Sequence, residues 1–174
     1  GMLADDSLGF DEMLPAIVEL TNTALDELVA TRQREGDKLA DMIRERVARM
    51  RELVAQAAPR MPAVVLEYQE RLTAKLRDAV ASLDEDRVRQ EVALYAQRID
   101  VDEELTRLST HLDEVERILK SAGAAGKRLD FLMQELNREA NTLASKSPAT
   151  DITAIAMEMK VLIEQMREQV QNLE

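Results

Sequence analysis

The stretch GKRLDFLMQELNREANTLASK, residues 126–146, decides the fold class of this chain. Its apolar residues recur at steps of three and four, which is the spacing of one face of an α-helix. They are Leu129, Leu132, Met133, Leu136, Ala140 and Leu143. A second row at the same spacing is polar and consists of Asp130, Gln134, Asn137, Asn141 and Ser145. The stretch therefore predicts an amphipathic helix with an unusual polar side.

This polar row is unusual because Asn, Asp and Ser are poor residues for a helix interior, each costing roughly half a kcal/mol relative to Ala. A helix face that only meets water is normally filled with Glu, Lys and Arg. Two interpretations stay open. The short side chains hydrogen-bond to a neighbouring helix or loop in a packed assembly, or they form the polar wall of a binding site.

The composition of the whole chain agrees with a helical fold. Its 174 residues are 45% apolar but only 2% aromatic, with five Gly and four Pro. The core must then be built from Leu, Val, Ile, Ala and Met, which suit helices better than sheets. We expect an all-α fold, an extended multi-helix bundle with a long N-terminal helix.

Charge and cysteine content exclude several classes of protein. The net charge of −11 argues against binding nucleic acid through the overall field, so any RNA contact needs a local basic patch, a partner domain or a metal ion. The absence of Cys excludes disulfides and zinc–thiolate sites. We find no apolar run of about 20 residues, no signal peptide and no nucleotide-binding loop. The lack of Cys is compatible with a reducing compartment, and we expect neither a membrane segment nor a small-molecule cofactor.

The periodicity predicts about six helices. We expect a tag scar at Gly1 and a flexible leader in residues 1–10, then a helix to Ala58 that is long enough for coiled-coil or intersubunit packing. Pro59 and Pro62 should separate it from a second helix, so that the long helix and a linker helix make up residues 11–82. Residues 83–174 hold the other four helices. The expected caps there are Asp100 and Ser147, with Pro148 in the first helical position and a turn from Gly123 to Gly126.

An arginine cluster in the first helix has two possible roles. It consists of Arg44, Arg46, Arg49 and Arg51. Either these side chains form a solvated face with acidic neighbours, or they contact phosphate.

The segment from Gln97 to Glu116 is the strongest candidate for chemistry, because it contains His111, the chain's only histidine, among several carboxylates. One imidazole with carboxylates suits a hard divalent ion such as Mg²⁺ or Mn²⁺. The candidate metal ligands are Asp100, Glu103, Glu104 and His111, and the candidate catalytic residues are His111, Glu104, Glu135 and Glu139. The short turn before residue 126 predicts antiparallel helices, which places Glu135 and Glu139 near the level of His111.

Two other roles for His111 stay open. It could be a structural residue beside an apolar seam, or a general base acting on a ribose hydroxyl without a metal. The candidate RNA-binding residues are Arg98, Arg107, Arg128, Arg138, Asn137, Asn141 and Lys146. The simpler role for Arg98 and Arg107 is a salt bridge to the nearby carboxylates.

Three blocks of the chain closely resemble the C-terminal region of the YicC family of bacterial proteins. They are EVALYAQRIDVDEELTRLSTHL (91–112), GKRLDFLMQELNREANTLASKS (126–147) and EMKVLIEQMREQVQNLE (158–174), and ALDELVATRQREG (24–36) resembles that family's joining segment. The resemblance implies an endoribonuclease, a hydrolase that cuts RNA in the cytoplasm and assembles as a homo-oligomeric hexamer. It also implies a preceding mixed α/β domain, whose RNA-binding surface or site residues this chain lacks.

Two functions follow as hypotheses. The first is the helical part of a metal-assisted endoribonuclease. The alternative is a non-catalytic oligomerisation or scaffold module of an RNA-associated protein. The net negative charge of the chain favours the scaffold module, and the Asn-rich polar row argues against it.

Overall fold

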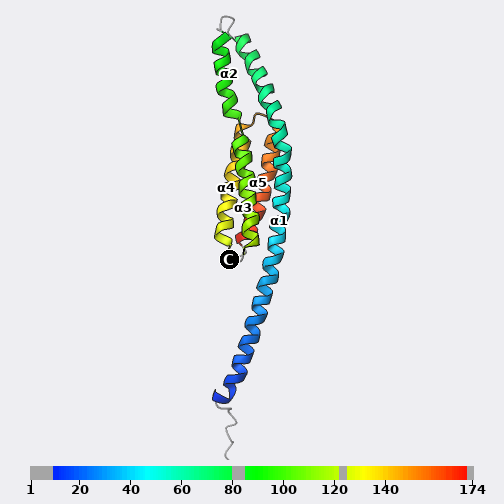
Figure 1. The fold of residues 1–174 in the computed structure, drawn as a ribbon, viewed down its shortest axis with the longest axis vertical. Helices are drawn as coiled ribbons and strands as arrows, with labels where there is room; N and C mark the ends of the chain where they lie inside the picture. Colours follow the sequence, from blue (N-terminus) through cyan, green and yellow to red (C-terminus); the bar gives the residue numbers. More distant parts are fainter. Residues whose placement is uncertain (1–9, 80–84, 122–124, 172–174) are drawn as a thin grey trace, which may run out of the picture. The chain divides into compact units, whose positions relative to one another are not determined.

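The computed structural model of the protein describes residues 10–79, 85–121 and 125–171. These ranges form five α-helices and no strand: α1 (Phe10–Ala79), α2 (Glu85–Ile99), α3 (Asp102–Lys120), α4 (Gly126–Lys146) and α5 (Thr150–Gln171) (Figure 1). The predicted all-α class, with its longest helix near the N-terminus, is confirmed. The predictions for the leader and for the turn at Gly123 fall on residues 1–9 and 122–124, outside the described ranges.

The chain divides into two compact units, Gly1–Ala40 and Asp41–Glu174. In the first unit the described residues belong to α1 alone. The second unit contains the later part of α1 and the four other helices. The boundary that the sequence predicts near residue 82 stays a prediction.

The prediction that two helices meet at Pro59 and Pro62 is wrong, because α1 runs through both residues. Both prolines are exposed, as are Ala55 and Ala58, whose carbonyl groups lose their usual helical donors. Water can bond those carbonyls, while the opposite side of the helix stays packed. The described part of the chain therefore has five helices rather than six.

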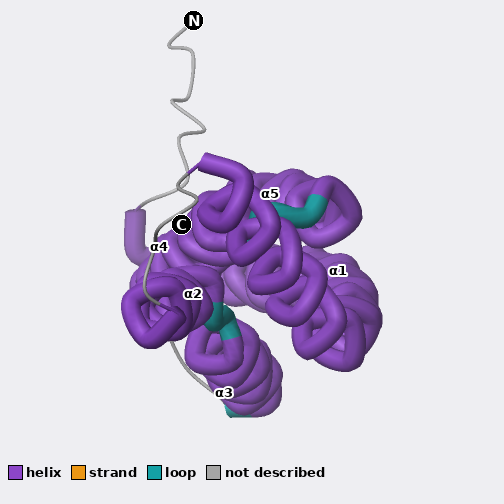
Figure 2. Tube along the Cα trace, turned by 90° about the horizontal axis from the view of Figure 1, so that it is seen from above, coloured by secondary structure: helices purple, strands orange, loops and turns teal. Residues whose placement is uncertain are grey.

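The core of the second unit lies among α1, α3, α4 and α5. α4 packs against both α3 and α5, and the four helices surround a common centre when viewed along the bundle (Figure 2). α1 contributes a buried stripe at steps of three and four: Ile43, Val47, Met50, Leu53, Ala57, Met61 and Val64. The core is aliphatic and rich in methionine, as the composition predicts.

Ion pairs join α1 to its neighbours in this unit. The Arg51 guanidinium lies 2.6 Å from Asp113 on α3. Arg49 lies 2.7 Å from Glu158, and Arg60 lies 2.9 Å from Asp151, both on α5. Arg44 and Arg46 pair with the nearby Asp41 and Glu45. The arginine cluster is therefore a face with acidic partners, and three of its members reach another helix: Arg49 and Arg51 through ion pairs, and Arg44 through a bond to the Leu119 carbonyl at 3.5 Å.

Two predicted helix starts are wrong, one by one residue and the other by two. Val101, not Asp100, is the N-cap of α3, although the Asp100 carboxylate accepts a bond from the Asp102 backbone N–H at 3.0 Å. Ser147 is the C-cap of α4, because its N–H donates to the Leu143 carbonyl at 3.2 Å. It therefore belongs to α4, and α5 begins beyond Pro148, at Thr150.

Candidate functional site

A strip of polar contacts joins α3 to α4, and we call it the α3–α4 seam. On α3 its members follow one another at steps of three and four, directly beside the buried apolar stripe. On α4 the partners run in the opposite direction, as expected for two antiparallel helices. The contacts in order are Glu104 with Lys146, Arg107 with Glu139, His111 with Glu135 and Glu139, and Glu114 with Arg128.

The centre of this seam is a cluster of His111, Glu135 and Glu139. Each offers one ligand atom, and these atoms all lie within 4.8 Å of one another. Glu135 and Glu139 are neighbours on α4 because they are four residues apart. His111 and Glu135 are half-buried, and Glu139 is only 3% exposed. The sequence predicts that these three side chains lie at about the same height along the antiparallel helix pair, and the structure places them together there.

Arg107 is the charged partner of Glu139, the buried residue of the cluster. Its Nη1 lies 3.4 Å from the Glu139 Oε1, and its Nη2 donates to Glu103. The carboxylate of Glu103, followed by that of Glu139, raises the pKa of Arg107. A permanently positive guanidinium therefore lies beside the buried Glu139 carboxylate.

Glu104 and Lys146 form the next contact along the seam. The Lys146 Nζ donates to the Glu104 Oε1 at 2.8 Å and to the Asp100 backbone carbonyl at 3.1 Å. The Glu104 side chain is 6% exposed, and its Oε2 has no hydrogen-bond partner. Among the residues that the structure describes, the three-ligand group at His111 does not include Asp100, Glu103 or Glu104. Glu104 is thus an ion-pair partner rather than a neighbour of the imidazole.

The other predicted RNA contacts are distributed over α2 and α4. Arg98 lies over the ring of Tyr95, Arg128 pairs with Glu114 at 3.3 Å, and Arg138 lies 3.9 Å from Glu135. Within the described ranges, Asn137 and Asn141 form no hydrogen bond through their side chains. Of the polar row, Asp130 reaches α5 through Arg167 at 3.7 Å. The two interpretations of the row both remain open.

Sequence reasoning missed the continuation of the seam to Glu114 and Arg128. The signal was present, because Glu104, Arg107, His111 and Glu114 follow at steps of three, four and three. The simpler role expected for Arg107, a salt bridge to the nearby carboxylates, is present in the structure, where Arg107 pairs with Glu103 and Glu139.

Comparison with known proteins identifies the family. A sequence profile described as "Endoribonuclease YicC-like, C-terminal" matches residues 57–174. This chain belongs to the YicC-like family. The matched region contains the whole α3–α4 seam, so the cluster is part of the family's own helical domain.

Two relatives are similar to this chain over more of its residues than the profile matches. A probable endoribonuclease YicC of Haemophilus influenzae is 53% identical over 168 residues, which cover 94% of this chain and 58% of that protein. A probable endoribonuclease YicC of Clostridioides difficile is 36% identical over 154 residues, 87% of this chain and 53% of that protein. The chain thus spans somewhat more than half the length of these YicC relatives. None of its described helices has the length and apolar character that crossing a membrane requires.

Proposed function

We propose that this chain is the helical part of a cytoplasmic endoribonuclease, with the cluster of His111, Glu135 and Glu139 at its reactive centre. The observation that carries the proposal is the convergence of one imidazole and two carboxylates within 4.8 Å, at the boundary between core and solvent. The names of the two relatives support RNA as the substrate.

The donor set fits a divalent ion such as Mn²⁺ or Mg²⁺. Ligand atoms around one Mg²⁺ ion are at most about 4.2 Å apart, twice the metal–oxygen distance of about 2.1 Å, so the observed cluster needs only small side-chain adjustments. His111, Glu135 and Glu139 would hold the ion. When bound, it would supply a Lewis acid for a phosphate oxygen and an activated water.

The chain's own residues have separate tasks in this proposal. Arg107 pairs with Glu139 and fixes its carboxylate from the α3 side. His111 either binds the ion or, in the metal-free alternative, accepts the proton of a ribose hydroxyl. Arg107 and Arg138 are 47% and 69% exposed, so both can also face a phosphate group.

The test is a cleavage assay on structured RNA with the wild-type chain and the Haemophilus influenzae relative in parallel. The proposal predicts cleavage that a chelator abolishes and added Mn²⁺ restores, and it predicts loss of cleavage in His111→Ala. Cleavage that survives the chelator but not His111→Ala would favour the general-base role. Cleavage that survives both changes would contradict the proposed centre.

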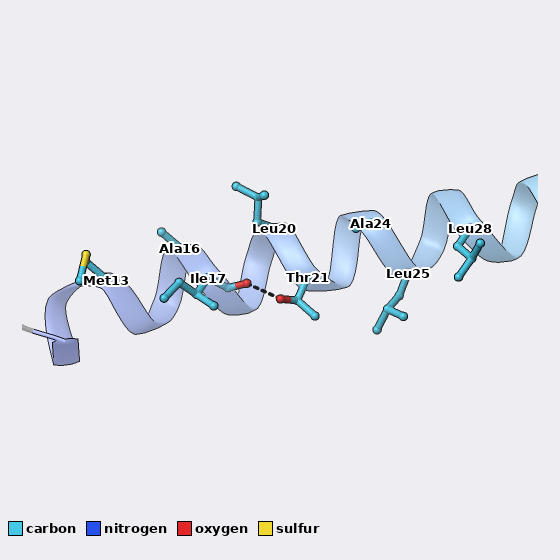
Figure 3. A pocket seen from close by; sticks show the side chains of 8 residues that line it. All are labelled: Met13, Ala16, Ile17, Leu20, Thr21, Ala24, Leu25 and Leu28. Atoms are coloured by element: carbon cyan, nitrogen blue, oxygen red, sulfur yellow. Dashed lines mark hydrogen bonds between the residues drawn. The ribbon is translucent and has the colours of Figure 1, made fainter.

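A second candidate function is an oligomerisation module, and the first unit favours it. Eight residues of α1 line an apolar groove along a single helix: Met13, Ala16, Ile17, Leu20, Thr21, Ala24, Leu25 and Leu28 (Figure 3). Leu20 is 74% exposed and Leu28 is 56% exposed. Apolar side chains this exposed are typical of a surface that another protein covers. We propose a homo-oligomer, with a hexamer as the expected form, whichever function the seam performs.

A further inference from the structure

The two tyrosines of the chain lie together, although 26 residues separate them in the sequence. Tyr68 is on α1 and Tyr95 is on α2, and their ring centroids are 6.2 Å apart with the ring planes tilted by 32°. Tyr95 is 37% exposed. A tilted aromatic pair at this distance is a favourable contact, but the exposed part of Tyr95 leaves apolar surface in water.

Each tyrosine has an arginine three residues later, within the repeated pattern Tyr-x-x-Arg. The Arg71 guanidinium lies 5.7 Å from the centre of the Tyr68 ring, and that of Arg98 lies 5.2 Å from the centre of the Tyr95 ring. Residues three apart on a helix share a face, so both pairs follow from the local spacing. We call these four residues the tyrosine pair and its arginines.

These arginines differ from most of those in the bundle. Arg49, Arg51 and Arg60 each pair with carboxylates on other helices. Within the ranges that the structure describes, Arg71 and Arg98 have no carboxylate within salt-bridge distance. Their charges are therefore available to an anion that reaches the surface.

A groove of about 450 Å³ is lined by residues beside the tyrosine pair in both helices. Val65 lies one helical turn before Tyr68, and Ala96 and Gln97 lie between Tyr95 and Arg98. Two carboxylates also line the groove, Asp100 just beyond the end of α2 and Asp102 at the first residue of α3. The Gln97 amide can both donate and accept, which is what the edge of a nucleobase requires.

We propose that the tyrosine pair and its arginines bind single-stranded RNA by stacking on its bases, with Arg71 and Arg98 facing the phosphates. Exposed aromatic rings next to guanidinium groups are the usual means of binding unpaired bases, because every base has a π-face. The proposal rests on the RNA-cleaving function proposed above. It adds that the substrate has an unpaired segment, held at α2, beyond the N-terminal end of α3.

The most direct test replaces Tyr95 with tryptophan, which gives the chain its only indole. Emission of Tyr95→Trp is measured while a 12-nucleotide single-stranded RNA is added in a buffer with chelator. The matched control is Leu94→Trp, because Leu94 is 55% exposed and adjacent in sequence but points away from the pair. We expect strong quenching in Tyr95→Trp, weak quenching in Leu94→Trp, and little quenching by an abasic strand of equal length. Equal quenching in both variants, or none in either, would overturn the proposal.

A second measurement separates stacking from packing. Ring removal in Tyr95→Leu should raise the dissociation constant for single-stranded RNA about tenfold, while Tyr95→Phe should leave it nearly unchanged. A lower melting temperature in Tyr95→Leu with unchanged RNA affinity would mean that the pair only joins α1 to α2. His111→Ala added to Tyr95→Trp should retain the quenching, so a failed catalytic proposal and a failed stacking proposal give different results.

Discussion

Glu139 illustrates at the scale of one residue why the cluster is a better candidate than any other acidic group in the seam. It is 3% exposed, and a buried carboxylate without compensation would be protonated or strongly destabilising. Arg107 supplies one positive charge at 3.4 Å, and a ring nitrogen of His111 lies within 4.8 Å of the carboxylate. Glu139 is thus a buried carboxylate whose cost to stability is offset by its positively charged partner.

The Glu104–Lys146 contact gives a stability prediction. Lys146→Met should destabilise the protein by about 3 kcal/mol, because it leaves the Glu104 carboxylate buried without a partner. The double variant Glu104→Leu, Lys146→Met should recover most of that loss. Urea unfolding of the wild type, both single variants and the double variant measures the coupling. Additive losses would show that the two side chains do not depend on each other.

Asp151 gives a prediction about pH. Its hydrogen bond with Arg60 lowers the pKa of the carboxyl group below its usual range, so the ion pair between α1 and α5 is complete above the ordinary Asp range. The stability that it contributes is lost only as the pH falls through the lowered pKa. NMR titration should show this low pKa in the wild type and an ordinary value in Arg60→Met. The same pKa in both proteins would contradict the assignment.

How far the sequence predicts the site depends on the kind of contact. The approach of His111 to Glu135 and Glu139 follows from a short turn, antiparallel helices and the constant rise of a helix. The partner of Lys146 does not follow, because Asp100, Glu103 and Glu104 all lie within reach of a flexible side chain. Which carboxylate it meets depends on the exact rotation of α3, and spacing alone does not fix that rotation.

At the scale of elements, α1 shows that packing against neighbouring helices can keep a helix continuous through residues that locally disfavour it. Pro59 and Pro62 predict a helix end, since proline lacks an N–H and crowds the preceding turn. In the structure both are exposed, and the buried Ala57, Met61 and Val64 continue one stripe past them. Burial of that stripe offsets the lost hydrogen bonds. Sequence reasoning weighed each proline by itself and could not weigh the neighbouring helices.

This account of α1 predicts that Pro59→Ala stabilises the protein. The new N–H can bond the Ala55 carbonyl, and the helix loses a residue that costs up to about 3 kcal/mol in a helix interior. We expect an increase of roughly 1–3 kcal/mol in the free energy of unfolding, measured by urea denaturation. The control is Ala58→Ser, an exposed change that should alter stability by less than about 0.5 kcal/mol. A loss of stability in Pro59→Ala would mean that the proline shapes the helix in a way that packing requires.

At the scale of the whole molecule, the exposed apolar face in the first unit predicts self-association. Light scattering at micromolar concentration should give a mass above that of one 19.6 kDa chain. Ile17→Glu combined with Leu20→Glu should lower that mass, because both side chains belong to the exposed face of α1. The same change at Leu66, which is 56% exposed on another part of α1, is the control. A monomeric wild type would contradict this prediction.

The central claim is that the cluster in the α3–α4 seam performs RNA cleavage, and single-turnover cleavage by Glu139→Gln tests it most directly. Glutamine keeps the size of the side chain and removes its charge. The matched variant is Glu114→Gln, a carboxylate of the same seam that pairs with Arg117 and Arg128 but lies outside the cluster. The account predicts that Glu139→Gln loses at least about 100-fold in rate, while Glu114→Gln stays within a few-fold of wild type. Equal rates in the two variants, with both proteins folded, would contradict it.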